Sequence, residues 1–404
     1  MAVVLSLCAL AACGSADAGS GRAPTLDWWV GADRADTMAL ARTCTAASGG
    51  DYSIRVRQLP ADVGERHTML VRRLAVKDMS IDLLSLDSAF TSEFSAARYL
   101  APVPDDLAVA YSTGVAPAAL AAATYEGQLA VVPWWFDPQL LWYRGNVAER
   151  AGLDTTGPVS WEDLIVGAER LGVTVQIDDV DGSGLGAWVS GLTAAAGGEV
   201  VKGAGRGAKA GLDTDAGRSA ALIVELYHES GLGPGPSRGA LKAFTAPDGG
   251  FLVAPSSVIT DPALASVAAD MGWTTYPAVG LTSIAPLAGV GLAVPLYAPE
   301  SDLSFRAITC LTSPTALAGL MVDSGHSASR LTTYDDPSVT SGFPMAAVTK
   351  AAVLSGRAVP ATPYWNVVRN AIDETWTPLR DVAQDSTPPA SQKAVLAALE
   401  GRLP

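Results

Sequence analysis

Hydrophobic and polar positions follow two different periods in the stretch that begins at residue 24. Short apolar runs rich in strand-forming residues occupy positions 25–30 and 81–86, and positions 52–57 alternate between apolar and polar as in a half-buried strand. Between these runs, positions 36–47 and 65–75 have the pattern of helices. This alternation of strands and helices predicts the opening of a doubly wound α/β lobe.

Aromatic and acidic residues gather where predicted strands end or break. Ligands of doubly wound domains lie beyond the carboxyl ends of the strands, so these positions are candidates for a binding site. Carboxylates pair with sugar hydroxyls and aromatic faces cover the C–H patches of the ring. Taken singly, each tryptophan is better explained as a core residue and each aspartate as a cap, but jointly they favour a sugar site. The set comprises Trp28, Trp29, Asp33, Asp87, Trp134, Trp135, Asp137, Tyr364 and Trp365.

The composition narrows the range of partners. The chain has 404 residues with 49% hydrophobic content, which is enough for one large core or two medium ones. Its net charge of −14 argues against nucleic acid and against a bare anionic membrane surface, because both would repel it. Beyond the N-terminal segment, no stretch approaches the roughly 20 uninterrupted apolar residues of a membrane span.

The N-terminal segment has the pattern of an export signal. An apolar run from Met1 to Leu10 leads through two alanines to Cys13, although no Lys or Arg precedes the run. Such a segment is typical of a signal that ends at a lipidation cysteine, and positions 15–22 have the composition of a flexible tether. We therefore expect residues 1–23 to be a lipoprotein signal and tether, with the lipid on Cys13. The alternative is a buried N-terminal helix with a chance cysteine.

The four cysteines fit export. Cys8 would leave with the signal and Cys13 would carry the lipid, so Cys44 and Cys310 remain as one possible pair. Disulfides persist outside the cytoplasm. Two separate buried thiols are the alternative.

Three sets of residues are too incomplete to predict chemistry. Positions 178–184 begin like a calcium loop, but Ser190 stands where an EF-hand starting at Asp179 would need its bidentate Glu. Positions 235–239 match G-x-S-x-G, but loop residues precede them where a hydrolase has a strand. Neither the histidines, His67, His228 and His326, nor the cysteines form a metal-binding motif, and the chain has no ATP-binding phosphate loop. We expect no metal and no cofactor.

A longer series of motifs resembles one protein family. Residues 125–133, 139–144, 149–153 and 160–164 carry Y-x-G-x-x-x-x-x-P, L-x-Y-R, A-G-L and S-W-E-D-L in that order. In combination they resemble the extracellular solute-binding proteins of carbohydrate ABC importers (the family 1 type). Within that family the chain is most similar to actinobacterial trehalose-binding lipoproteins, from about Leu26 to its C-terminus.

The resemblance implies an α/β fold of the two-lobed periplasmic-binding-protein type (type II), with the ligand cleft between the lobes. The N-terminal lobe would comprise residues 24–135 and 285–335, and the C-terminal lobe residues 136–284 and 336–404. The chain would cross between the lobes near positions 133–138, 285–290 and 330–335. Cys44 and Cys310 fall where the relatives carry a cysteine pair, which implies a disulfide.

The resemblance also implies roles in the cleft. Asp87 would accept hydrogen bonds from sugar hydroxyls, Arg330 would donate from the opposite wall, and the backbone of Gly289 and Val290 would line the floor. Asp137 stands where the relatives have an amide, and a carboxylate can only accept, so the hydroxyls read there must differ. The remaining departures are Arg66, which replaces a shorter polar residue, and residues 254–257, which replace a segment with a stacking tryptophan. Asp33, Trp134 and Trp135 complete the expected ligand-binding set.

Three functions from different classes fit these observations. A transport receptor would capture a disaccharide, with trehalose as the first candidate, by hinge closure and deliver it to ABC permease subunits that have a separate ATPase. A secreted glycoside-acting enzyme would use the cleft carboxylates on the sugar. A surface scaffold would bury the aromatic clusters. We expect the receptor: a monomer without catalytic residues, lipid-anchored to the outer face of the cell membrane.

Overall fold

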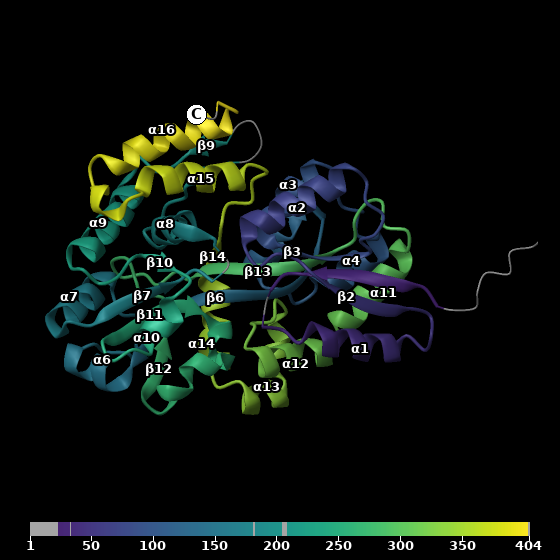
Figure 1. Ribbon diagram of the computed structural model, residues 1–404, viewed down its shortest axis with the longest axis horizontal. Helices are drawn as coiled ribbons and strands as arrows, with labels where there is room; N and C mark the ends of the chain where they lie inside the picture. Colours follow the sequence, from purple (N-terminus) through teal and green to yellow (C-terminus); the bar gives the residue numbers. More distant parts are fainter. Residues whose placement is uncertain (1–22, 33, 181, 204–207, 403–404) are drawn as a thin grey trace, which may run out of the picture.

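Two central strands, β6 (Val132–Arg144) and β13 (Pro286–Ala293), run antiparallel to each other and take part in both lobes of the molecule (Figure 1). The computed structural model describes residues 23–32, 34–180, 182–203 and 208–402. Within this part of the chain, the main sheet has the order β10-β7-β11-β6-β13-β3-β1-β2, with β12 added to β6 and β14 added to β13. The α/β two-lobed fold expected from the sequence is confirmed.

The N-terminal lobe is built on three parallel strands, in which β1 lies between β2 and β3. Helices α2 and α3 cover one face of this sheet, and α1 lies on the other (Figure 1). The predicted strands and helices of the first ninety or so positions are all present, with ends shifted by at most two residues. The elements of this lobe are β1 (Thr25–Val30), α1 (Thr37–Ala47), β2 (Ser53–Gln58), α2 (Val63–Ala75), β3 (Leu83–Asp87), η1 (Ser88–Phe90), α3 (Thr91–Ala96), α4 (Asp105–Ser112), α5 (Pro117–Ala122), β4 (Thr124–Tyr125), β5 (Gln128–Leu129), α11 (Ser301–Leu311), α12 (Pro314–Ser324) and η6 (Leu331–Asp335).

The C-terminal lobe continues the sheet on the other side of β6. Strand β11 is antiparallel to β6 and parallel to β7. Its elements are α6 (Gly145–Ala151), α7 (Trp161–Leu171), β7 (Thr174–Asp178), α8 (Gly184–Ala195), β8 (Val201–Lys202), β9 (Lys209–Ala210), α9 (Asp215–Glu229), β10 (Pro236–Ser237), α10 (Ala240–Phe244), β11 (Gly249–Pro255), η3 (Ser256–Thr260), η4 (Pro262–Ser266), η5 (Ala268–Asp270), β12 (Met271–Thr274), α15 (Trp365–Trp376), η7 (Leu379–Asp381) and α16 (Thr387–Leu399).

The last crossing between the lobes lies later in the chain than the expected positions 330–335. Helices α13 (Pro337–Gly342) and α14 (Ala346–Ser355) follow η6, and they pack on α12, η6 and α5, which belong to the N-terminal lobe. Strand β14 (Arg357–Ala358) then pairs with β13, and α15 packs on α8 of the C-terminal lobe. The chain therefore changes lobes between α14 and α15. Residues 336–355 accordingly pack with the N-terminal lobe rather than with the C-terminal lobe to which the sequence assigned them.

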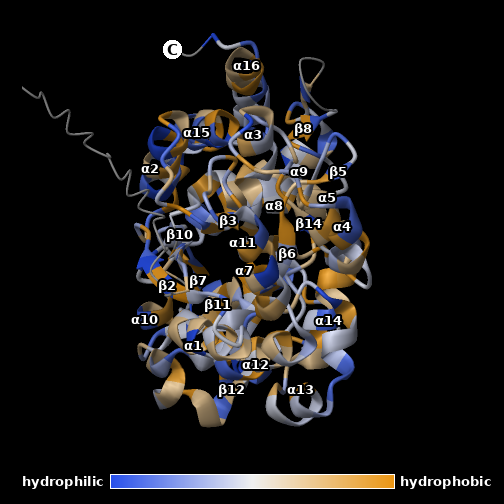
Figure 2. Cartoon of the chain, turned by 90° about the vertical axis from the view of Figure 1, so that its right-hand side faces the viewer, coloured by the Kyte–Doolittle hydropathy of each residue, from blue (hydrophilic) through white to orange (hydrophobic). Residues whose placement is uncertain are grey.

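A disulfide joins two helices of the N-terminal lobe. Cys44 in α1 and Cys310 in α11 are bonded, with 5.8 Å between their Cα atoms, so the pairing implied by the resemblance is present. No single described helix has the length and apolar composition to span a membrane, although α11 and α12, bent by 60°, pass that test together. Hydrophilic residues lie at the periphery, for example on α4 (Figure 2).

Candidate functional site

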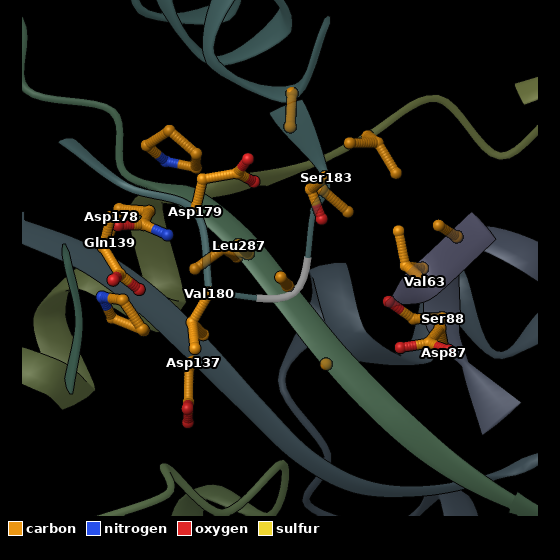
Figure 3. Close-up of a pocket in the computed structure, with 18 of the residues that line it drawn as sticks. Val63, Asp87, Ser88, Asp137, Gln139, Asp178, Asp179, Val180, Ser183 and Leu287 are labelled. Atoms are coloured by element: carbon orange, nitrogen blue, oxygen red, sulfur yellow. The ribbon is translucent and has the colours of Figure 1, made fainter. Parts of the chain in front are cut away.

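A cavity of about 440 Å³ lies between the two lobes. Its volume falls within the range of about 300–1,000 Å³ that is usual for small-molecule sites. Asp87 and Ser88 of the N-terminal lobe stand on one side, Gln139, Asp178 and Asp179 stand on the other, and Leu287 of β13 lies between them (Figure 3). The cavity is therefore built from both lobes, and its floor is the pair of shared strands.

The alternation of side chains along β6 decides which of its residues reach the cavity. Trp135, Asp137 and Gln139 are two positions apart and all line it, because alternate residues of a strand point to the same face. Trp134 points to the opposite face. It is fully buried and packs edge-on against Trp28, with ring centroids 5.6 Å apart. Of the two expected aromatic residues on β6, only Trp135 is therefore part of the site.

Strand β13 supplies the rest of the floor. Val290 pairs with both Trp135 and Asp87, and it lines the cavity together with Gly289. A Cβ atom on Gly289 would lie 2.2 Å from the ring of Phe136 and 2.3 Å from the carbonyl oxygen of Trp135. Glycine is thus needed at this position so that β13 can lie close to β6.

Arg66 and Asp87, both expected in the site, form a bidentate ion pair. The Arg66 guanidinium donates to the two carboxylate oxygens of Asp87 at 2.8 and 3.0 Å. It also donates to the carbonyl oxygens of Pro60 and Ala61, both at 2.9 Å, and its side chain is only 6% exposed. The Asp87 side chain is 20% exposed. Because a carboxylate has about four acceptor positions, Asp87 keeps capacity for ligand hydroxyls while Arg66 fixes its orientation.

Asp137 also lines the cavity, but both of its oxygens already have protein partners. One accepts from Nδ1 of His326 at 2.7 Å and the other from the backbone N–H of Ser327 at 2.7 Å. The side chains of Asp137 and His326 are 3% and 4% exposed. His326 lines the cavity as well, and its ring stacks on Trp135 with centroids 4.1 Å apart and planes 19° apart. The sequence did not single out His326 as a site residue.

The expected arginine donor Arg330 lies outside the cavity lining. Its guanidinium donates to the carbonyl oxygens of Thr113 at 2.8 Å and Ala110 at 3.1 Å, and so it holds the end of α4. Another arginine, Arg357 of β14, lines the cavity with an exposed side chain. Among the described residues its guanidinium donates only to the adjacent carbonyl of Gly356, at 3.3 Å. Asp33 and Cys13 lie outside the described residues.

Aromatic side chains from the C-terminal lobe form the far wall. Trp188 of α8, Tyr276 and Trp365 of α15 line the cavity, and Trp188 and Tyr276 both contact Trp161 behind them. Burial raises the pKa of the Tyr276 hydroxyl, which keeps it neutral. Of these three residues, only Trp365 was among the candidates predicted from the sequence. Trp188 was not among them because the glycine-rich segment before it has the composition of a loop.

Several charged groups in the cavity wall are paired or hydrogen-bonded within the protein. Besides the Arg66–Asp87 pair, Arg34 contacts Asp261 at 2.7 Å, and Asp179 accepts from the backbone N–H of Gly184 at 2.7 Å. No group of three or more His, Cys, Asp or Glu in the described part of the chain could hold a metal ion. The wall therefore offers hydrogen-bonding groups and aromatic surface rather than a strong net charge.

Two ion pairs join the lobes beside the cavity, the Arg34–Asp261 pair and a pair formed by Asp62 and Arg238. Asp62 caps α2 by accepting from the backbone N–H groups of Gly64 and Glu65 at 2.9 and 3.0 Å. The same carboxylate contacts the guanidinium of Arg238, which follows β10 in the other lobe. The hydrogen bond from Glu65, then that from Gly64 and the charge of Arg238, outweigh desolvation and lower the pKa of Asp62 below its ordinary value of 3.8.

Two α/β lobes, shared central strands and a cavity between the lobes define a two-lobed ligand-binding protein. The model of the bacterial extracellular solute-binding protein family matches residues 48–318, and the chain belongs to this family. Proteins of this family bind solutes outside the cytoplasm, which agrees with the expectation of a binding protein rather than an enzyme.

Solved structures of sugar-binding proteins share the fold. The GacH receptor of Streptomyces glaucescens is 19% identical, with a TM-score of 0.80 over 94% of this chain and 99% of its own. Maltose-bound MalE3 of T. maritima is 20% identical, with a TM-score of 0.78 over 93% and 99%. The cyclic α-maltosyl-1,6-maltose binding protein of Arthrobacter globiformis is 19% identical, with a TM-score of 0.75 over 93% and 99%. At these identities the likeness establishes the fold alone.

Proposed function

We propose that this chain is the sugar receptor of an ABC importer and that it captures a neutral disaccharide, with trehalose as the first candidate, in the cavity between its lobes. The observation that carries the proposal is the character of the cavity wall. The carboxylates of Asp87, Asp137, Asp179 and Asp261 are held by arginines, a histidine or backbone N–H groups, while aromatic surface and hydrogen-bonding groups surround the space. Such a wall suits a ligand with many hydroxyls and no charge.

Three structures with the same fold support this choice of ligand class, although others hold smaller ligands, α-D-tagatose and ribitol. The GacH structures include complexes with acarbose and an acarbose homologue, and MalE3 was solved with maltose. The Arthrobacter globiformis protein binds a cyclic maltosyl-maltose. All three are receptors for glycosides larger than a monosaccharide, and a cavity of about 440 Å³ can hold a ligand of that kind.

Each residue of the site has a proposed role. Asp87, oriented by Arg66, accepts from sugar hydroxyls, and Trp135 with Trp365 provides apolar surface for the ring. Gly289 and Val290 form the floor. Arg357 is the arginine that donates to hydroxyls, a role that the resemblance had assigned to Arg330. Asp33, whose position lies outside the described residues, remains a candidate from the sequence.

The receptor would work by closure of the lobes and transfer of the sugar. The closed, loaded form would dock on permease subunits whose ATPase is a separate chain. The apolar run before Cys13 supports export and a lipid anchor at that residue, which would hold a monomeric receptor at the outer face of the cell membrane.

Isothermal titration tests the proposal. The domain without the signal and with Cys13 removed, its disulfide intact, is titrated with trehalose, maltose, sucrose and glucose, and each sample is then assayed for new reducing sugar or other product. Saturable one-site binding of a disaccharide without product supports the receptor. If the protein binds only another of these sugars tightly, that sugar replaces trehalose as the proposed ligand. The absence of heat with every sugar would refute the carbohydrate assignment. Product formation would favour a glycoside-acting enzyme.

A further inference from the structure

Asp137, His326 and Trp135 form a continuous series of contacts in the cavity wall. The carboxylate of Asp137 accepts from Nδ1 of His326, and the imidazole lies nearly parallel to the indole of Trp135. Asp137 and His326 are almost fully buried, whereas Trp135 is only partly buried and lines the cavity. Asp137 and His326 therefore have little surface for a ligand, and the member of the series with the most surface for one is the indole.

The backbone fixes this series from both ends. Residues 327–329 run antiparallel to β6: the N–H of Phe136 donates to the carbonyl of Ser327 at 2.7 Å, and the N–H of Ser329 donates to the carbonyl of Trp134 at 3.1 Å. These bonds set His326 opposite Asp137. The second oxygen of Asp137 is held by the N–H of Ser327, so the carboxylate cannot turn away from the imidazole.

The hydrogen bond to Asp137 determines which nitrogen of the His326 ring carries a proton. An ionised carboxylate can only accept, so Nδ1 of His326 carries a proton and the ring cannot rotate about its own axis without losing that bond. The imidazole covers one part of the Trp135 surface with a separation of 4.1 Å between centroids. An indole that is packed in this way loses little conformational freedom when a sugar ring rests on its remaining surface.

We infer that Asp137 and His326 are positioning residues: Asp137 holds the imidazole, the imidazole holds the indole of Trp135, and the indole packs against the C–H face of the bound sugar. Asp137 thus acts on the ligand through His326 instead of reading a hydroxyl itself. This inference rests on the proposed sugar-binding function.

The chain contains a matched control for this arrangement. His67 also contacts a carboxylate, that of Glu93, at 2.9 Å, and its ring also lies against an aromatic side chain, Phe90, at 4.6 Å. His67 does not line the cavity, and Phe90, although it is part of the wall, is only 2% exposed. His67→Ala therefore reports the general cost of removing a partly buried histidine that is paired with a carboxylate and packs on an aromatic ring.

The experiment compares His326→Ala, His326→Phe and Asp137→Asn with His67→Ala in titrations with trehalose and maltose, using whichever the wild-type protein binds more tightly. We expect His326→Ala to weaken binding about tenfold, because the indole loses its support. His326→Phe keeps an aromatic ring against Trp135 and should stay within about threefold of wild type, and Asp137→Asn should fall between the two. His67→Ala should leave the dissociation constant within about twofold of wild type.

Two further measurements keep the result interpretable. Thermal melting shows whether each variant is folded at the titration temperature, and 19F NMR of fluorotryptophan-labelled protein, with the Trp135 signal assigned by Trp135→Phe, reports the indole directly. Broadening or a shift of that signal in His326→Ala, reversed in His326→Phe, is the expected result. Wild-type affinity in His326→Ala, or equal losses in His326→Phe and His326→Ala, would overturn the inference. Should the wild-type protein bind no sugar, the proposed function fails and the inference falls with it.

Discussion

Removal of the ion pair between Asp62 and Arg238 should weaken sugar binding slightly without changing the sugar preferred. The pair joins α2 of the N-terminal lobe to the residue after β10 of the C-terminal lobe, next to Val63 and Pro236 of the cavity wall. We expect the pair to stabilise the closed form of the proposed receptor, because an open form in which the lobes separate would lose it. A ligand that binds only on closure would then bind less tightly.

The expected loss of affinity follows from the solvent exposure of the two side chains. The Arg238 and Asp62 side chains are 53% and 35% exposed, so the pair belongs to the weak class of surface ion pairs, which contribute about 0.2–1 kcal/mol. A mid-range value of about 0.5 kcal/mol corresponds to an increase in the dissociation constant of about twofold. Salt should abolish the difference, because the Debye length falls to about 3 Å at 1 M ionic strength.

Two substitutions at Asp62 separate the ion pair from the helix cap. Asp62→Asn removes the charge but keeps a good N-cap, whereas Asp62→Ala removes both and should lower the free energy of unfolding by about a further 1 kcal/mol. Arg238→Gln removes the pair from the other side and leaves the cap intact. Titration and thermal melting of the three variants at low and high salt should give equal losses of affinity at low salt and an extra loss of stability only in Asp62→Ala.

The pH dependence has a defined sign. The folded-state pKa of Asp62 is lowered below 3.8, so its contribution to stability is fully present above pH 3.8 and is lost as the pH falls through the lower, folded-state value. Titrations at neutral pH therefore measure the fully charged pair. Unchanged affinity in both Arg238→Gln and Asp62→Asn at low salt would refute the assignment of this pair to the closed form.

Three further outcomes can be checked with the same assays. Replacing Cys44 and Cys310 by serine opens a cross-link between positions 266 residues apart and should reduce the free energy of unfolding by about 5 kcal/mol in the loop-entropy model, measured by denaturant titration with and without reductant. Gly289→Ala places a Cβ 2.2 Å from Phe136 and should destabilise the fold by about 1–3 kcal/mol in thermal melts; an unchanged melting temperature would contradict the close contact of β6 and β13. Arg357→Gln should weaken disaccharide binding about tenfold, while Arg330→Gln should change it less than twofold and lower only the melting temperature; the reverse order would restore Arg330 as the donor.

The local pattern of hydrophobic and polar residues was sufficient to predict most strands and helices at the start of the N-terminal lobe. The strands at 25–30 and 81–86 are apolar because they are covered on both faces, and their helices carry one apolar side, so period alone identifies them. The alternation rule could also have separated Trp134 from Trp135, since neighbouring residues of a strand face opposite ways. What local pattern does not provide is which of the two faces meets the cavity. That depends on how β13 and the second lobe pack on β6.

The sequence failed for a similar reason to show that Arg357, and not Arg330, lines the cavity. Both arginines lie late in the chain, Arg330 after a polar segment and Arg357 after a largely apolar one, and neither segment indicates which arginine lies beside the cavity. The outcome depends on where the last crossing falls: η6 and α14 stay with the N-terminal lobe, so Arg330 meets the carbonyls at the end of α4, and the later β14 brings Arg357 to the floor.

Asp137 shows most clearly why a site residue can be located from sequence while its role is not. A carboxylate on a strand that borders a sugar cavity is a reasonable candidate for a direct hydrogen bond to a hydroxyl. Its availability, however, depends on whether other groups have taken its oxygens, and here the partners are His326 and Ser327, 189 and 190 positions away. No motif links positions at such a distance, because the contact is made by a segment that lies beside β6 only in the folded chain. The identity of a polar residue therefore predicts that it takes part in the site, and only its hydrogen-bond partners in the folded chain show whether it contacts the ligand or positions the residue that does.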